Sequence, residues 1–366
     1  MNKSNSEIGC GPTEVAASKA ISKRSFFKKL GMGTALAAGA PYIMGAAKKP
    51  IKWRLQTYAS SALGAYVIKP AVEAFNKAAN GEMFIELYYA DQLVPTSELF
   101  SSLQQGTLDC VQSDDDSMGS PADVAQFSAY FPLATRYSLD VPALFHDFGL
   151  AKLWEESYKE VKNVTWLSSG SWDPCNFITK DPITKLADIK GKKIYTSPTC
   201  GRFLAQFGIV PITVPVEDVE MAMRTGELDG VAWCGITEAY TVGWANATKY
   251  FLTNNISGAW IGSFLANSKS WEAVPEHLKE LFKLAMDSSN YFRQHWYWAG
   301  EAKLRVKGDK LKLTTIGAEE WKTVEDAAVK FWDDIAAKGT PRAKQVVQIL
   351  RDYNAIMDKA GPPYRY

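Results

Sequence analysis

Three successive carboxylates, Asp114, Asp115 and Asp116, form the densest group of chemically active side chains in the sequence. They follow the apolar stretch from Leu108 to Gln112, which is typical of a buried strand. Because open α/β sheets bind ligands at the carboxyl ends of their strands, we expect Asp114 and Asp115 to face a ligand. A solvated turn or the start of a helix would use the same residue types, so that alternative stays open.

Two further groups combine tryptophan with polar side chains. Trp172, Asp173 and Asn176 follow an expected strand, at a place where we expect the chain to cross between two lobes of the protein. Trp233 and Cys234 end another expected strand. Carboxylates beside aromatic faces suit a cationic or amine-bearing solute, through ion pairing and cation–π contact. A structural role in a core or a hinge is the alternative for each tryptophan.

The cysteines are candidate nucleophiles, but the sequence does not give them catalytic partners. Cys175, Cys200 and Cys234 have no histidine nearby in sequence, so we interpret them as small apolar wall residues. Whether any of them form a disulfide is left open. Neither a zinc-ligand spacing nor a nucleotide-binding fingerprint stands out, and we expect no metal and no cofactor. A periplasmic hydrolase or lyase on an α/β scaffold is the alternative from another class.

The composition is that of a globular protein without a strong charge. Its 366 residues suffice for two domains, and 46% hydrophobic residues can build their cores. Lysine plus arginine number 41 against 40 acidic residues, a balance that gives no reason to expect a nucleic-acid partner.

A repeated phrase indicates two similar α/β units. Residues 103–111 match residues 223–231, and in each a helix is expected to end at a glycine, Gly106 or Gly226, before a strand. The separation of 226 − 106 = 120 residues is far longer than the roughly 20–50 residues of a solenoid repeat. We therefore predict two α/β lobes, each with one helix–glycine–strand unit.

The N-terminal region over residues 1–47 is typical of an export signal. A basic stretch at Ser22–Lys28 precedes a Gly/Ala-rich apolar run, and Gly45 to Ala47 provide small residues before a cut. The pattern resembles a twin-arginine signal with Lys23 in the place of the first arginine. We expect export to the periplasm by that route; the general secretory route and an uncleaved membrane anchor are the alternatives.

Local patterns place the first elements of the mature chain. A strand is expected from Ile51 to Tyr58. Val67, Ala71 and Phe75 then have the spacing of one amphipathic helix, and a further helix is expected over residues 341–359.

Several phrases and their order resemble the solute-binding proteins of tripartite ATP-independent periplasmic (TRAP) transporters. The resemblance covers roughly residues 51–360. It is carried by Leu186-Ala-Asp-Ile-Lys-Gly-Lys-Lys-Ile, by Gly226-Glu-Leu-Asp229-Gly and its counterpart Gly106-Thr-Leu-Asp109, and by Trp271-Glu-Ala-Val-Pro-Glu-His-Leu. The tail from Arg342 to Tyr353 is similar to the branch that includes 2-oxoacid binders.

The resemblance implies an α/β, two-lobed periplasmic binding protein fold with hinge strands and long C-terminal helices. It implies a first part of lobe I at 51–172, the main part of lobe II at 173–260, and a return to lobe I, the hinge and the C-terminal helices at 261–366. The lobes would close on one small organic solute and deliver it to TRAP membrane subunits. Some members of this branch form homodimers through the C-terminal helix.

The sequence departs from this family where the ligand is bound. Family members usually place an arginine that binds the ligand carboxylate where this chain has Tyr195. A second ligand arginine of some members falls near Cys175, and Ala232 stands where metal-assisted 2-oxoacid binders have a carboxylate. A metal-bridged 2-oxoacid is therefore not expected. Arg202 is the nearest cation in sequence for an anionic ligand, with a surface-helix role as its alternative.

We therefore predict a receptor for an amine-bearing or zwitterionic solute. The alternatives are a small organic acid or sulfonate held by another cation such as Arg202, and the detached sensor of a signalling receptor. The residues expected to contact the ligand are Tyr58, Asp114, Asp115, Trp172, Asp173, Asn176, Tyr195, Arg202, Trp233, Cys234 and Trp260.

Overall fold

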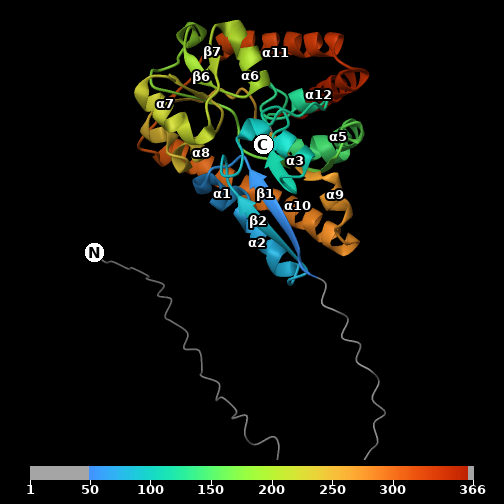
Figure 1. Cartoon of the computed structure of the whole chain (residues 1–366). Coiled ribbons are helices and arrows are strands. Elements are labelled where there is room, and N and C mark those ends of the chain that lie inside the picture. The colour runs from blue at the N-terminus through green and yellow to red at the C-terminus, as the bar shows by residue number, and fades with distance from the viewer. Residues whose placement is uncertain (1–48, 362–366) are drawn as a thin grey trace, which may run out of the picture. The chain divides into compact units, whose positions relative to one another are not determined.

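The computed structural model describes residues 49–361 and shows two β-sheets that helices cover (Figure 1). The predicted export signal at 1–47 lies outside the described residues. Within the described range, no helix combines the length and the apolar character that crossing a bilayer requires.

Lobe I, as the term is used from here on, holds a mixed five-stranded sheet in the order β2-β1-β3-β10-β4. β1 pairs in parallel with β2 and β3, whereas β10 runs antiparallel to β3 and β4. The elements are β1 (Ile51–Thr57), α1 (Ser61–Val67), α2 (Lys69–Ala78), β2 (Met83–Tyr88), α3 (Leu99–Gln105), β3 (Cys110–Ser113), α4 (Asp140–Pro142), α5 (Leu150–Lys159), β4 (Val164–Ser171), β10 (Ile261–Asn267) and α9 (Ser268–Glu272).

Lobe II holds a six-stranded sheet in the order β11-β9-β5-β8-β6-β7. Its strand β11 belongs to the stretch 261–366, which the resemblance assigned to lobe I, the hinge and the C-terminal helices; the division by residue ranges stays a proposal. The elements are β5 (Phe177–Thr179), β6 (Lys193–Tyr195), α6 (Pro198–Leu204), β7 (Val210–Ile212), α7 (Val219–Thr225), β8 (Gly230–Ala232), α8 (Ile236–Thr241), β9 (Tyr250–Leu252) and β11 (Lys312–Thr314).

A two-stranded ribbon joins the sheets. Residues 172–176 leave β4, residues 256–260 return to β10, and the two segments run antiparallel. The backbone N–H of Trp172 donates to the carbonyl of Trp260 at 3.0 Å, and the N–H of Trp260 donates to the carbonyl of Asp173 at 2.8 Å. This ribbon therefore places four of the predicted ligand residues, Trp172, Asp173, Asn176 and Trp260, between the lobes.

Three long helices follow: α10 (Glu276–Lys307), α11 (Ala318–Lys338) and α12 (Pro341–Ala360). The predicted C-terminal helix is confirmed as α12, which begins where Thr340 accepts a hydrogen bond from the N–H of Ala343. Helix α10 contacts both lobes. Its Arg293 donates to the carbonyl of Val67 in lobe I, and its Glu301 accepts from the N–H of Thr237 in lobe II.

The predicted helix–glycine–strand units are confirmed in both lobes. Helices α3 and α7 end at Gly106 and Gly226, whose φ angles of 79° and 87° lie in the left-handed region that glycine adopts without a Cβ penalty. Three residues later, the carboxylates of Asp109 and Asp229 each accept the N–H of a residue in the neighbouring strand, at 2.9 and 2.8 Å. One local design therefore aligns β3 in lobe I and β8 in lobe II.

The prediction of a single amphipathic helix after β1 is wrong. The structure has two helices, α1 and α2, with a break at Ile68, whose ψ of −41° accompanies a φ of −136°. Pro70 explains the break, because its nitrogen has no hydrogen to donate and its ring collides with the carbonyl one turn earlier. The helical spacing of the apolar residues continued across a position that backbone chemistry does not allow.

Candidate functional site

A cavity of about 230 Å³ lies between the two lobes. This volume is below the roughly 300–1,000 Å³ of common ligand pockets, so the cavity suits a small solute. Lobe I lines it with Tyr58, Asp91, Pro95, Thr96, Ser97, Asp114 and Ser117. Lobe II lines it with Tyr195, Thr196, Pro198, Thr213, Val214, Pro215, Val216 and Trp233. None of these fifteen side chains is basic.

Strand ends position the side chains of this cavity. Tyr58 follows β1, Asp114 follows β3, Tyr195 ends β6 and Trp233 follows β8. These are the carboxyl ends of parallel strands, where open α/β sheets bind ligands. These four residues share one cavity, and their contact with a ligand stays a prediction.

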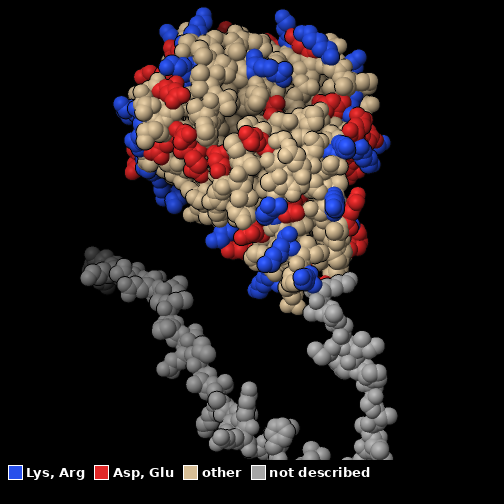
Figure 2. All heavy atoms as spheres, in the orientation of Figure 1, with Lys and Arg blue, Asp and Glu red and all other residues tan. Residues whose placement is uncertain are grey.

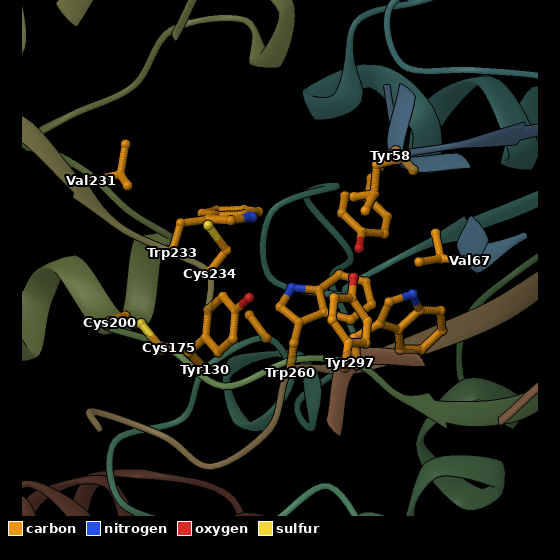
Figure 3. Close-up of a cluster of buried hydrophobic side chains, with 14 of the residues drawn as sticks. Tyr58, Val67, Tyr130, Cys175, Cys200, Val231, Trp233, Cys234, Trp260 and Tyr297 are labelled. Carbon is orange, nitrogen blue, oxygen red and sulfur yellow. The ribbon is translucent and has the colours of Figure 1, made fainter. Parts of the chain in front are cut away.

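Behind the cavity, aromatic rings form a buried group that we call the aromatic cage: Tyr58, Tyr130, Trp172, Trp233, Trp260 and Tyr297. Tyr58 stacks on Trp260 with ring centroids 4.5 Å apart, and Trp172 meets Trp260 edge to face at 4.7 Å. Figure 3 shows Tyr58 and Trp233 on opposite sides of a space toward which the hydroxyl of Tyr130 also points. The cage combines residues of both lobes, the ribbon and α10.

Two carboxyl groups, Asp173 and Glu238, are buried at this cage. Asp173 accepts hydrogen bonds from the hydroxyl of Tyr130 at 3.0 Å and from the N–H of Gly235 at 2.8 Å. Glu238 accepts one from the hydroxyl of Tyr297 at 2.9 Å. All of these donors are neutral, and no basic side chain among residues 49–361 forms an ion pair with either carboxyl group.

Burial without a cation shifts the titration of both acids. It raises the pKa of Glu238 to about 7, with Glu301 contributing by repulsion. Burial and the neighbouring Glu238 hold the pKa of Asp173 well above its usual range. A cation in the cage would favour the ionised form of both groups, so the site is electrostatically complementary to a positive charge.

Arg293 is the buried cation nearest to this cage, and its hydrogen bonds are committed to neutral groups. Its nitrogens donate to the carbonyls of Ser171 and Val67 and to the side chains of Ser289 and Asn290. The guanidinium lies 3.6 Å from the ring centroid of Trp172, which is a cation–π contact. Arg293 therefore supports a cage wall from behind and does not take the carboxylate-binding role.

Several buried polar atoms around the cavity and the cage have no hydrogen-bond partner. They include the indole nitrogens of Trp172 and Trp260 and the carboxylate oxygen Oδ2 of Asp114. Hydroxyls of Ser117 and Thr196 on the cavity wall are in the same state. Because buried polar groups are normally paired, the unpaired atoms of Asp114, Ser117 and Thr196 on the cavity wall, and those of the two tryptophans in the adjoining cage, indicate a polar ligand.

The three successive aspartates after β3 have three different environments. Asp115 faces away from the cavity and accepts hydrogen bonds from Trp154, Tyr158 and Ser263 inside lobe I. Asp114 lines the cavity with one oxygen unpaired.

Asp116 connects the lobes. Its Oδ2 accepts the backbone N–H of Thr199, at the start of α6, at 2.7 Å. Because Asp116 belongs to lobe I and α6 to lobe II, this hydrogen bond joins the two sides of the cleft. A carboxylate at the first turn of a helix is also favoured by the helix dipole.

Two other predicted ligand residues have structural partners. The side-chain nitrogen of Asn176 donates to the carbonyls of Leu252 and Asn254, which stabilises the start of β5. Arg202 is exposed on α6, donates to the hydroxyl of Thr199 at 3.1 Å and is absent from the cavity lining.

Sequence reasoning missed Tyr130, Glu238, Arg293 and Tyr297. Tyr130 lies in a segment without a regular pattern. The other three lie on α8 and α10, and no local sequence motif indicates that these helices contact the ribbon. The signal available in the sequence for Glu238 was its position one helical turn after Trp233-Cys234.

Asp173, Cys234 and Glu238 also place one ligand atom each within 4.8 Å of one another, as a metal site would require. Hard cations such as calcium take six or more oxygen ligands. The set here contains a thiol, and burial raises the pKa of Cys234 well above its usual range, which keeps the sulfur protonated. These residues therefore do not fit calcium or sodium.

Comparison with known proteins identifies the family. The model of the bacterial extracellular solute-binding protein family 7 matches residues 58–339. The chain is 60% identical to a TRAP periplasmic solute-binding protein from Chromohalobacter salexigens that was crystallised with (S)-(+)-2-amino-1-propanol. That match covers 86% of this chain and 99% of the other, with a TM-score of 0.84.

More distant relatives share the architecture. A monocarboxylate 2-oxoacid-binding periplasmic protein from Nostoc is 21% identical over 313 residues, 84% of each chain. A TRAP protein from Pseudoalteromonas atlantica with bound sodium and pyruvate is 18% identical and has a TM-score of 0.75, over 85% of this chain and 98% of that one. One from Colwellia psychrerythraea with calcium and pyruvate is 18% identical with a TM-score of 0.73, over the same shares.

These likenesses confirm the two-lobed α/β fold that the sequence predicted. The chain belongs to family 7 of the bacterial extracellular solute-binding proteins, and it is an extracytoplasmic solute receptor of a TRAP transporter.

Proposed function

We propose that this receptor captures a small amine that carries a hydroxyl group and no carboxylate. The observation that supports this most is the buried pair Asp173 and Glu238, which faces the aromatic cage without a basic partner among the described residues. Isolated buried carboxylates are costly, and an ammonium group with three N–H donors would offset that cost. Aromatic faces around it would add cation–π attraction.

The neutral and polar parts of the site favour the rest of this chemistry. A ligand carboxylate would need a cation, but the cavity lining contains no basic side chain and Tyr195 replaces the family's usual arginine. The unpaired indole nitrogens of Trp172 and Trp260 are donors that suit a hydroxyl oxygen. The relative from Chromohalobacter, at 60% identity, binds a solute of this class.

In this proposal the lobes close on the solute and release it unchanged to TRAP membrane subunits, so the protein is not an enzyme. Burial raises the pKa of Cys234 and of Cys175, and a protonated thiol is a poor nucleophile. Export by the twin-arginine route through residues 1–47 and a homodimer through α12 stay predictions. One relative, from Bordetella bronchiseptica, is described as a dimer.

Calorimetry with ethanolamine tests the proposal. Wild-type protein should bind ethanolamine, and Glu238→Gln should weaken binding at least tenfold, about 1.4 kcal/mol. Glutamine keeps the side-chain size and an oxygen for the hydroxyl of Tyr297, so the variant removes charge more than shape.

Asp115→Asn is the matched control, because Asp115 is equally buried among neutral donors but faces away from the cavity. It should leave ethanolamine affinity unchanged once folding is verified by thermal melting. Binding of pyruvate in the absence of ethanolamine binding would contradict the proposed function.

A further inference from the structure

We propose that the cleft contains a second cation subsite around Asp114 and that short aliphatic diamines are among the receptor's solutes. One ammonium group would bind at Asp173 and Glu238, and the other would bind at Asp114. This inference rests on the proposed function, because the first of these subsites is the one argued above.

The burial and the hydrogen bonding of Asp114 are those of a binding group and not of a surface acid. Its side chain is 1% exposed, its Oδ1 accepts the N–H of Ser117 at 2.6 Å, and its Oδ2 has no partner although it belongs to the cavity lining. Burial and repulsion from Asp116 raise the pKa of Asp114 to about 8. An ammonium group at Oδ2 would supply the missing hydrogen bond and the missing charge.

Hydroxyl oxygens from both lobes surround the same part of the cavity. Thr96 and Ser117 belong to lobe I and Thr196 to lobe II, and all three have an unpaired side-chain oxygen. An ammonium group donates three hydrogen bonds, so one carboxylate oxygen and two hydroxyls can satisfy it. Contacts from opposite lobes would also make binding of this second ammonium depend on closure.

In this proposal, Tyr58 and Trp233 provide the apolar surface between the two subsites. Both line the cavity and both also belong to the aromatic cage. Figure 3 shows the two rings facing a common space. Electrostatic repulsion from Asp114, Asp173 and Glu238 contributes to a raised pKa of Tyr58, after burial itself, which places this ring near both acidic centres. Methylene groups of a diamine would pack between these rings.

Acidic residues at the mouth of the cavity favour a ligand with more than one positive charge. Asp91 lines the cavity, and exposed Glu217 and Asp218 follow the cavity residue Val216. Burial, Asp91 and Asp218 together raise the pKa of Glu217. Figure 2 shows acidic side chains gathered over the part of this face where Figure 1 has α7 and α8. Such a surface attracts cations, and a dication more strongly than a monocation.

Matched pairs of ligands separate the second subsite from the first. Putrescine and aminobutanol have the same chain length, but one ends in ammonium where the other ends in hydroxyl. The same holds for ethylenediamine and ethanolamine. We expect calorimetry with wild-type protein to show that at least one diamine binds tenfold more tightly than its amino alcohol partner.

Asp114→Asn should lower diamine affinity at least tenfold and amino alcohol affinity by a clearly smaller factor, because only the diamine places a second charge at Asp114. Asparagine keeps an oxygen for the N–H of Ser117, so the fold around the site is retained, and thermal melting checks this. Glu238→Gln should weaken both ligands of a pair, because both use the first subsite.

The outcomes distinguish this inference from the proposed function. If amino alcohols bind and no diamine binds more tightly, the second subsite is refuted while the amine receptor stands. Equal losses for both ligands in Asp114→Asn would also refute it. Absence of binding for every amine would refute both.

Discussion

The carboxyl ends of β3 and β8 are two regions with the same framework and different chemistry. In each, a helix ends at a left-handed glycine, and an aspartate three residues later accepts a backbone N–H of the adjacent strand. After β3 the chain continues with three carboxylates, whereas after β8 it continues with Trp233, Cys234 and Gly235.

This difference separates what positions a site from what gives it selectivity. The glycine and the aspartate fix where each strand begins, and they do so in the same way in both segments. The residues beyond the strand then differ: lobe I supplies charge and a bond across the cleft, and lobe II supplies an aromatic wall. The family can therefore change its solute without changing its framework.

The largest expected effect comes from removing the hydrogen bond that joins Asp116, which follows β3, to the N–H of Thr199 across the cleft. Asp116→Ala removes the acceptor of the Thr199 N–H, and a charged hydrogen bond of this kind contributes about 1.5–3 kcal/mol. We expect solute affinity to fall at least tenfold, and small-angle scattering to show a larger radius of gyration at equal saturation. Asp147→Ala, an exposed acid of lobe I, is the control and should change neither.

A smaller effect tests whether the two frameworks are equivalent. Gly106→Ala and Gly226→Ala should each cost about 1 kcal/mol of unfolding free energy, because alanine is strained at these φ angles. No clash adds to that cost: an added Cβ at Gly106 would lie 3.7 Å from Asn267, and one at Gly226 would have nothing within 4 Å.

Urea unfolding measures these costs. Gly317→Ala is the control, since its φ is negative and a Cβ there would also meet nothing within 4 Å. Costs that differ more than twofold between the first two variants would show that the frameworks are not equivalent.

The smallest expected effect is the contribution of the β3 end to the pH dependence of stability, beside the contributions of Asp173 and Glu238. The folded protein holds the pKa of Asp114 at about 8 and that of Asp115 at about 6, above their ordinary values of about 4. The folded state therefore binds these protons more tightly than the unfolded state, and this stabilisation is lost as pH rises from about 4 to 8.

Thermal melting of ligand-free protein should accordingly give a Tm that falls over this pH range. Asp114→Asn should make the fall shallower, by at least about 2 °C across the range. An identical change of Tm with pH in the variant and in wild type would show that Asp114 does not contribute to the pH dependence.

The sequence predicted the framework well because its signals are local. Glycine at a helix end, the spacing of Leu108 to Gln112 and the repeated phrase depend on neighbours in sequence, and the structure bears them out. The single helix expected after β1 failed for an equally local reason, because apolar spacing was weighed above the backbone chemistry of Pro70.

The buried part of the site could not be predicted, because it depends on contacts between segments that are distant in sequence. Tyr297 reaches Glu238 over 59 residues, and Arg293 reaches Val67 over 226. Sequence alone also could not distinguish Asp114 from Asp115, since adjacent side chains at a strand end point in different directions and only packing decides which one meets the cleft.

The ribbon that joins the lobes carries Trp172, Asp173 and Trp260, so the connection between the lobes is also part of the cage. In the proposed closure the lobes would turn about this ribbon, and a bound solute would lie close to the axis of rotation. Bulk close to an axis restricts rotation more than the same bulk near the rim. A solute too large for the space beside the ribbon would therefore hold the lobes apart, however well its ammonium group is bound. Solute size would then be selected by steric exclusion, independently of the charge interactions.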